Sequence, residues 1–109
     1  MATTVELVRE LDGWRGHAAL YKLSSPVGFA RTWDGDGNRV IGHTKYVVVS
    51  AVDFTTPLVG RIHETYIFPS DENANITGWC ELPGSVRNTT SHKEALDGLI
   101  RYIDAEEED

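Results

Sequence analysis

The pattern of hydrophobic positions places two adjacent strands at the centre of the predicted fold. Residues 43–54 carry apolar side chains at both odd and even positions, including three consecutive valines. Apolar residues on both faces are typical of an interior strand. A turn around Pro57, which has no N–H to continue a ladder, leads into a second apolar run over 61–68. We therefore predict that these two runs form a central hairpin.

Two further strands are expected beside this hairpin. Residues 14–23 alternate between two largely apolar faces, and the Ser-Ser-Pro sequence at 24–26 is expected to end that strand. The segment from there to Arg39 is rich in Gly, Asp and Pro, which predicts a long loop or a loosely formed hairpin. Turn formers precede residues 76–82 and a Pro-Gly pair follows them, so this segment is the fourth predicted strand.

The clearest helix signal lies near the C-terminus. Ser91 and Glu94 have the spacing of a capping box, in which the hydroxyl and the carboxylate each bond to a backbone N–H at the helix start. The apolar residues that follow form one stripe at helical spacing: Ala95, Leu96, Leu99, Ile100 and Ile103. Such a stripe predicts a helix that packs on a sheet.

The N-terminal segment is compatible with two structures. Thr3 and Glu6 repeat the capping-box spacing, which favours a short helix ended by the Asp-Gly pair at 12–13. The alternation of Val5, Leu7 and Arg9 is also that of a strand. We take the helix as the prediction, and its short length means that it depends on tertiary packing.

Together these elements predict an α+β fold, with a mostly antiparallel sheet of about four strands and a C-terminal helix packed on one face. The 109 residues, 40% of them hydrophobic, are enough for one core. We expect a single domain over residues 1–103 and an acidic disordered tail over 104–109.

The net charge of −7 is concentrated in that tail. Five of the seventeen acidic residues lie in 104–109, which leaves twelve acidic and ten basic residues in 1–103, a net charge of −2. A terminal acidic run usually aids solubility, although an acidic decoy of nucleic acid remains an alternative. No basic stripe is present to contact phosphates, so direct nucleic-acid binding is not expected.

Cysteine usage and hydropathy indicate the compartment. Cys80 is the only cysteine, which excludes an internal disulfide. The N-terminus lacks the basic start and apolar run of a signal peptide, and no apolar stretch approaches the roughly twenty residues that cross a bilayer. We expect a cytoplasmic protein without membrane association.

No residue pattern with useful specificity for a metal, a cofactor or catalysis is found. The Asp34–Asn38 segment resembles the start of a calcium loop, but Arg39 and Lys45 occupy the positions that require Gly and Glu. The four histidines lack the spacing of metal ligands: His17, His43, His63 and His92. We expect no cofactor, no metal and no enzymatic activity.

An alternative hypothesis is a small-ligand-binding or hydrolytic domain whose pocket lies between the helix and the sheet. With Pro57 and Glu72 near the turn centres, His63 would oppose Glu81 and Glu64 would oppose Cys80. These four residues would have to converge in one pocket. A cysteine on a strand is more often a buried hydrophobic residue than a nucleophile.

Several short stretches carry a family resemblance. They are Trp14–Leu23, Glu64–Asp71, Trp79–Ser85 and His92–Leu96. Together they resemble small uncharacterised proteins of actinobacteriophages and their actinobacterial hosts, with expected departures in the loop at 28–39 and in the acidic tail. The resemblance implies a phage or prophage protein in the host cytoplasm, and it implies no activity and no site residues.

The leading hypothesis is a non-catalytic accessory protein that binds a host or phage protein. Trp33 precedes the Asp-Gly cluster and is either an exposed anchor for a partner or a lid on the sheet. The residues expected to contact a partner are Trp33, Asp34, Asp36, Glu72, Glu106, Glu107 and Glu108. A homodimer through an unprotected sheet edge, such as the strand over 18–23, is also open.

Overall fold

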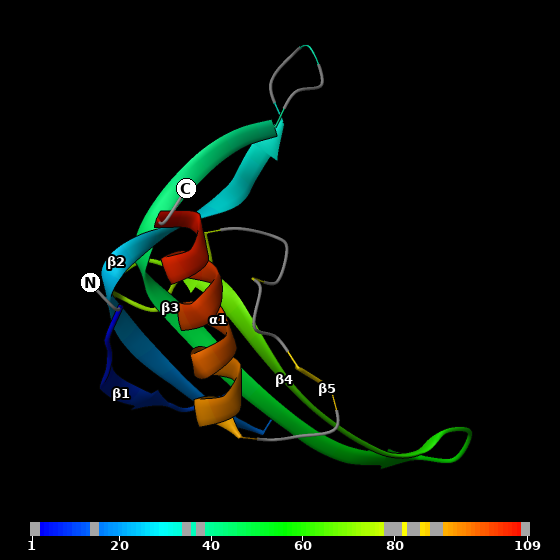
Figure 1. Cartoon of the computed structure of the whole chain (residues 1–109). Coiled ribbons are helices and arrows are strands. Elements are labelled where there is room, and N and C mark those ends of the chain that lie inside the picture. Colours follow the sequence, from blue (N-terminus) through cyan, green and yellow to red (C-terminus); the bar gives the residue numbers. More distant parts are fainter. Residues whose placement is uncertain are drawn as a thin grey trace.

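The computed structural model is a five-stranded antiparallel sheet with one helix across a face (Figure 1). It describes residues 3–13, 16–33, 36, 39–77, 82, 86–87 and 91–107. The strands follow one another in sheet order: β1 (Val5–Leu11), β2 (His17–Trp33), β3 (Arg39–Thr56), β4 (Gly60–Ser70) and β5 (Val86–Arg87). The helix α1 (His92–Glu107) comes last. The predicted α+β fold is thereby confirmed.

The middle of β3 is interior, as its apolar pattern predicts. Val47 and Val49 are fully buried on the face that packs against α1, and Val48 is fully buried on the opposite face. Val49 pairs with Ala19 of β2 and with Ile67 of β4, so the strand has a hydrogen-bonded neighbour on each side. The middle of β3 is therefore covered on both faces and on both sides.

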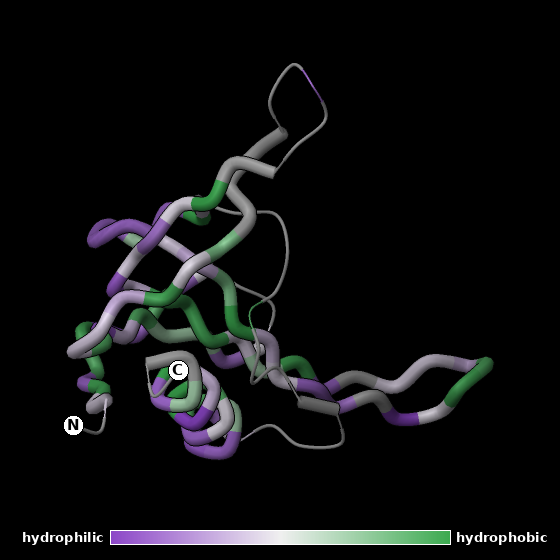
Figure 2. Tube along the Cα trace, turned by 45° about the horizontal axis from the view of Figure 1, so that its top comes forward, coloured by the Kyte–Doolittle hydropathy of each residue, from purple (hydrophilic) through white to green (hydrophobic). Residues whose placement is uncertain are grey.

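The helix packs through the predicted stripe. Ala95, Leu96, Leu99 and Ile103 are buried, and they join one core cluster with Val47 and the other inward-facing strand residues. Figure 2, which looks nearly along the helix, shows it lying against one side of the sheet. The helix begins as predicted, because the backbone N–H of Glu94 donates to the Ser91 hydroxyl at 3.3 Å.

Replacing Ser91 by alanine is expected to lower the free energy of unfolding by about 0.5–2 kcal/mol, because an N–H at the helix start loses its acceptor. Ser91→Asp keeps an acceptor there and is expected to stay within about 0.5 kcal/mol of the wild type. Urea unfolding of the three proteins measures the difference. An equal loss in both variants would mean that the capping bond contributes little.

The N-terminal segment is a strand, so the predicted helix is wrong. Val5 pairs with Leu23 and Leu7 pairs with Tyr21 on β2, and Val5 packs against the core cluster. A helix this short would have to be stabilised by packing, whereas the strand adds ladder bonds to a sheet that already exists. The register shifts after Leu7, which indicates a bulge in β1.

The Ser-Ser-Pro sequence does not end β2, contrary to the prediction. Lys22 pairs with Tyr46 and Val27 with Thr44, so five steps along β2 match two steps along β3, and a large bulge takes up the difference. Pro26 lies in that bulge, where its missing N–H breaks no ladder bond. The predicted loop after residue 23 is therefore mostly a strand, and the long hairpin projects from the core (Figure 1).

The helix also continues beyond the expected domain boundary at residue 103. α1 ends at Glu107, and the Asp104 carboxylate accepts hydrogen bonds from the Thr3 N–H at 3.0 Å and the Thr3 hydroxyl at 2.7 Å. These bonds from Thr3 hold the pKa of Asp104 below its ordinary value. The expectation of a disordered tail starting at residue 104 is wrong for 104–107, because the N-terminus anchors this last part of the helix.

The fourth predicted strand is described only at its ends. Ile76 forms a single bridge with Ser70, and the Leu82 N–H donates to the carbonyl of Ile67 at 2.7 Å. Residues 78–81 lie outside the described part of the chain. The turn predicted before this segment is confirmed, since Asp71 accepts from the backbone N–H groups of Asn73 and Asn75.

Candidate functional site

The β3–β4 hairpin extends beyond the core as an arm, which we define as residues 53–63 (Figure 1). Its tip, residues 56–60, carries two aliphatic side chains in solvent. Leu58 is 96% exposed and Val59 is 70% exposed. Figure 2 shows the resulting hydrophobic colouring at the far end of the arm. Aliphatic residues this exposed, side by side at the end of a projection, are the most prominent unburied apolar feature among the described residues.

Local hydrogen bonds stabilise the turn at the tip. Thr56 pairs with Gly60, and the Val59 N–H donates to the Thr56 hydroxyl at 3.2 Å. That hydroxyl in turn donates to the carbonyl of Gly60 at 3.4 Å. Gly60 has a φ of 78°, which closes the turn without steric cost because glycine has no Cβ. The two aliphatic side chains are therefore presented on an ordered turn.

The charges nearest the tip neutralise each other. The Arg61 guanidinium donates two hydrogen bonds to the Asp53 carboxylate, at 3.0 and 2.8 Å. Bonding to Arg61 lowers the pKa of Asp53 below its ordinary value, and bonding to Asp53 raises the pKa of Arg61. Both groups stay ionised at neutral pH, so the base of the tip carries a closed ion pair and no net charge.

The structure does not gather the residues that the sequence predicts as a partner surface. Asp36 lies at the end of the β2–β3 hairpin, Glu72 is exposed in the turn after β4, and Glu106 and Glu107 occupy the last turn of α1. Asp34, Glu108 and the side chain of Trp33 lie outside the described part, so whether Trp33 is an anchor or a lid stays open. Those of the predicted residues that the structure describes thus lie on three separate segments of the chain.

The pocket hypothesis is not supported by the described residues. His63 and Glu64 are consecutive in β4, so their side chains point to opposite faces of the sheet. Glu64 pairs with Val52 and with Arg87, so the predicted register with Cys80 is wrong by seven residues. The segment between β4 and β5 therefore takes up more residues than a simple hairpin. Cys80 and Glu81 themselves lie outside the described part.

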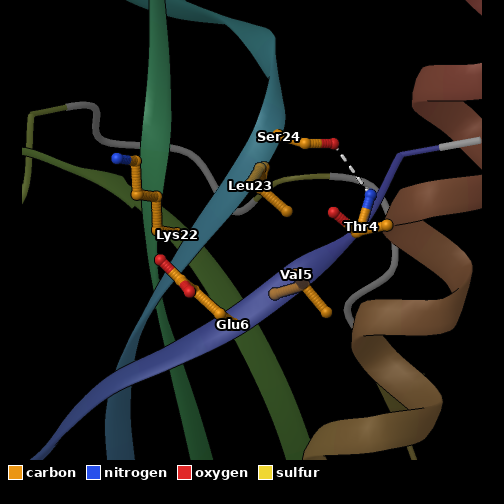
Figure 3. Close-up of a pocket in the computed structure, with 6 residues that line it drawn as sticks. All are labelled: Thr4, Val5, Glu6, Lys22, Leu23 and Ser24. Atoms are coloured by element: carbon orange, nitrogen blue, oxygen red, sulfur yellow. Dashed lines mark hydrogen bonds between the residues drawn. The ribbon is translucent and has the colours of Figure 1, made fainter.

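A shallow cavity of about 240 Å³ lies across the start of β1 and the middle of β2 (Figure 3). Its polar lining includes Glu6 and Lys22, which are cross-strand partners, and Ser24, whose hydroxyl accepts from the Thr4 N–H at 2.8 Å. Neither histidine nor cysteine is among the described residues that line it. Within the described residues no group of three His, Cys, Asp or Glu side chains is arranged to bind a metal ion.

The fold also brings together two histidines that are 75 residues apart in the chain. The rings of His17 and His92 stack with centroids 4.3 Å apart and planes 13° apart. Glu10 bonds to the Nε2 of His17, and the Tyr21 hydroxyl lies 2.9 Å from the Nδ1 of His92. This cluster joins β1, β2 and the first residue of α1.

The sheet edges differ from the expected ones. The 18–23 segment is paired with both β1 and β3, so it is interior and the predicted dimerisation edge there is wrong. β1 and β5 are the outer strands, and the bulge in β1 interrupts the regular edge that a second chain would need there. The helix of the described part is too short and too polar to cross a membrane.

Sequence reasoning treated Leu58 and Val59 only as part of a turn. Two adjacent aliphatic residues between Pro57 and Gly60 are unusual in a turn, and that was the available signal. Comparison with protein-family models, curated proteins and solved structures gives no match. The function is therefore argued from the geometry of the chain itself.

Proposed function

We propose that this chain is a non-catalytic accessory protein that binds another protein, with the β3–β4 tip inserted into an apolar pocket of the partner. The observation that carries the proposal is Leu58, which is 96% exposed on a turn held by hydrogen bonds. A large aliphatic side chain exposed to this degree has no role in the core of its own chain. The resemblance to actinobacteriophage proteins makes a cytoplasmic host or phage protein the expected partner.

The energetics favour a pocket in a protein. Burying Leu58 and Val59 would contribute about 1.5–3 kcal/mol each, and the ordered turn reduces the entropy lost on binding. An anionic bilayer is a poorer partner, because binding to it relies on basic residues. Here Arg61 is already paired with Asp53 and the chain carries a net charge of −7.

Replacing Leu58 by aspartate is expected to weaken binding at least 100-fold, because a carboxylate would enter an apolar pocket without a counter-charge. The wild-type chain serves as bait in lysates of an actinobacterial host with and without phage. The captured protein is then purified, and calorimetry measures its affinity for each variant. Thermal unfolding is expected to change little, since the site is exposed.

The matched control is Ile41→Asp, which places the same charge on another exposed aliphatic residue, 55% exposed on the β2–β3 hairpin. Its affinity is expected to stay within about twofold of the wild type. Equal losses for both variants, or no loss for Leu58→Asp, would contradict the proposal. A loss confined to Trp33→Ala, or to deletion of residues 104–109, would instead move the surface to the residues predicted from the sequence. Co-sedimentation with anionic vesicles that requires Leu58 would also contradict it.

A further inference from the structure

The His17–His92 cluster couples the first turn of α1 to the sheet through groups that bind protons. Its contacts form a chain from Glu10 to His17, by ring stacking to His92, and by a hydrogen bond to Tyr21. The Nε2 of His92 also lies 3.1 Å from the carbonyl oxygen of His17. His92 is half-buried, and it is the first residue of the helix.

The hydrogen bonds define the neutral tautomer of His92. A backbone carbonyl can only accept, so Nε2 carries the proton and donates it to the oxygen of His17. Nδ1 then has a lone pair, and the Tyr21 hydroxyl donates to it at 2.9 Å. Burial raises the pKa of Tyr21, with a contribution from Glu10, so the hydroxyl keeps its proton as a donor. Every polar atom of this ring thus has a matched partner when the ring is neutral.

A second proton on His92 would oppose this arrangement in three ways. The new Nδ1–H would point at the Tyr21 hydroxyl, whose own hydrogen would have to turn away. The charge would sit at the N-terminal end of a helix, where the macrodipole is already positive. It would also lie in a partly desolvated position against the stacked ring of His17, and two protonated rings at 4.3 Å repel each other.

We propose that His92 is a pH-sensitive clasp, which docks the first turn of α1 onto β2 at neutral pH and releases it as the pH falls below about 6.5. Release would uncouple the helix start from the sheet and loosen Ala95 and Leu96, which are buried directly behind it. The remainder of α1 stays attached through Leu99, Ile103 and the bond from Thr3 to Asp104.

The charged groups around His92 do not prevent its protonation from releasing the first turn of α1. Among the described residues, those that face His92 are Glu10 from β1, and His17 and Tyr21 from β2. Glu10 favours the charged form of His92, but its carboxylate is bonded to His17. On the helix itself, Lys93 bonds to Asp97 at 2.9 Å on the exposed side, and Glu94 is exposed in the first turn.

The pH range over which the clasp is lost follows from the direction in which the pKa of His92 departs from its ordinary value. Burial lowers the pKa of His92 below its ordinary value of about 6.5, so the unfolded chain binds the proton more readily. The stability contributed by the neutral ring is therefore full above about pH 6.5 and is lost as the pH falls through the lower folded value. Asp53, Asp71 and Asp104 also have lowered pKa values, but their contributions are lost only below about pH 4.

Hydrogen exchange of the Ala95 and Leu96 amides tests the clasp in the full chain. After correction for intrinsic rates, their protection is expected to fall at least about threefold between pH 7.5 and pH 5.0, because the released ring binds a proton more readily than the docked ring. His92→Gln, which cannot be protonated, is expected to reduce that fall to less than twofold. His43→Gln, at an exposed histidine of the β2–β3 hairpin, is the control and is expected to keep the full fall.

Protection that is equal at the two pH values would overturn the proposal, and so would a fall that persists in His92→Gln. If His92→Gln does not fold, an NMR titration of the imidazoles in the unmodified chain decides instead. A His92 that titrates below the unfolded value, together with shifts in the Ala95 and Leu96 amides at the same midpoint, supports the clasp. A midpoint at or above about 6.5 contradicts it.

Discussion

Replacing Leu99 by alanine is expected to lower the free energy of unfolding by about 2–5 kcal/mol. Leu99 is fully buried in the middle of the apolar stripe, and it belongs to the cluster that joins α1 to β2, β3 and β4. Truncation removes buried methyl groups and leaves a cavity that rigid strands can only partly fill. Alanine is the best helix former, so the helix itself would not be weakened. The loss therefore reports packing between the helix and the sheet.

Leu58→Ala is the matched control, because it makes the same chemical change at a side chain that is 96% exposed. Its free energy of unfolding is expected to stay within about 0.5 kcal/mol of the wild type. Urea titrations followed by circular dichroism give both values, and similar slopes would show that the unfolding transition is the same. Similar losses in the two variants would contradict the assignment of Leu99 to the core.

The sequence predicted the elements whose signals are local. Val47, Val48 and Val49 marked an interior strand because both faces of their strand are apolar, and the structure buries all three. Ser91 marked the start of the helix because its hydroxyl accepts an N–H three residues later. These features depend on neighbours in the chain, so they can be recognised without knowing the rest of the fold.

The predictions were wrong where contacts with residues distant in the chain determine the secondary structure or the strand register. Val5 is in a strand because Leu23 lies opposite it, and nothing within the N-terminal segment distinguishes that strand from a short helix. Pro26 looked like a strand end, but a bulge between β2 and β3 accommodates it. The register of Glu64 was wrong because the chain takes up extra residues between β4 and β5. Local sequence patterns do not show how many residues the bulge in β2 or the segment between β4 and β5 takes up.

The candidate sites show the same limit. The contact of His17 with His92 spans 75 positions, and it exists because β2 and the start of α1 meet in the folded chain. The tip with Leu58 was visible in the sequence as a turn, but its exposure follows from the length of the arm beyond the core. The sequence showed which residues are unusual, and the fold showed which of them are presented to solvent or to each other.

Replacing Gly16 by alanine is expected to lower the free energy of unfolding by about 3–5 kcal/mol, among the largest effects of a single small substitution. Gly16 has a φ of 76°, which L-residues rarely adopt. A Cβ there would lie 2.0 Å from the carbonyl oxygen of Ala51 and 3.3 Å from the Cα of Val52. Both atoms belong to the backbone of β3, the central strand, so relief requires a shift where His17 pairs with Ala51.

Gly13→Ala separates the cost of a positive φ from the cost of the steric clash with β3. Gly13 has a similar φ of 83°, but no atom lies within 4 Å of the position that its Cβ would take. The variant's free energy of unfolding is expected to fall only by the cost of placing alanine at a positive φ, about 1–2 kcal/mol. The lower entropy of the unfolded chain partly offsets this cost. The difference between the two variants in urea unfolding then measures the steric clash with β3. If both variants lost the same amount, the close approach of residue 16 to the backbone of Ala51 would be ruled out, and the cost of a positive φ alone would account for the loss.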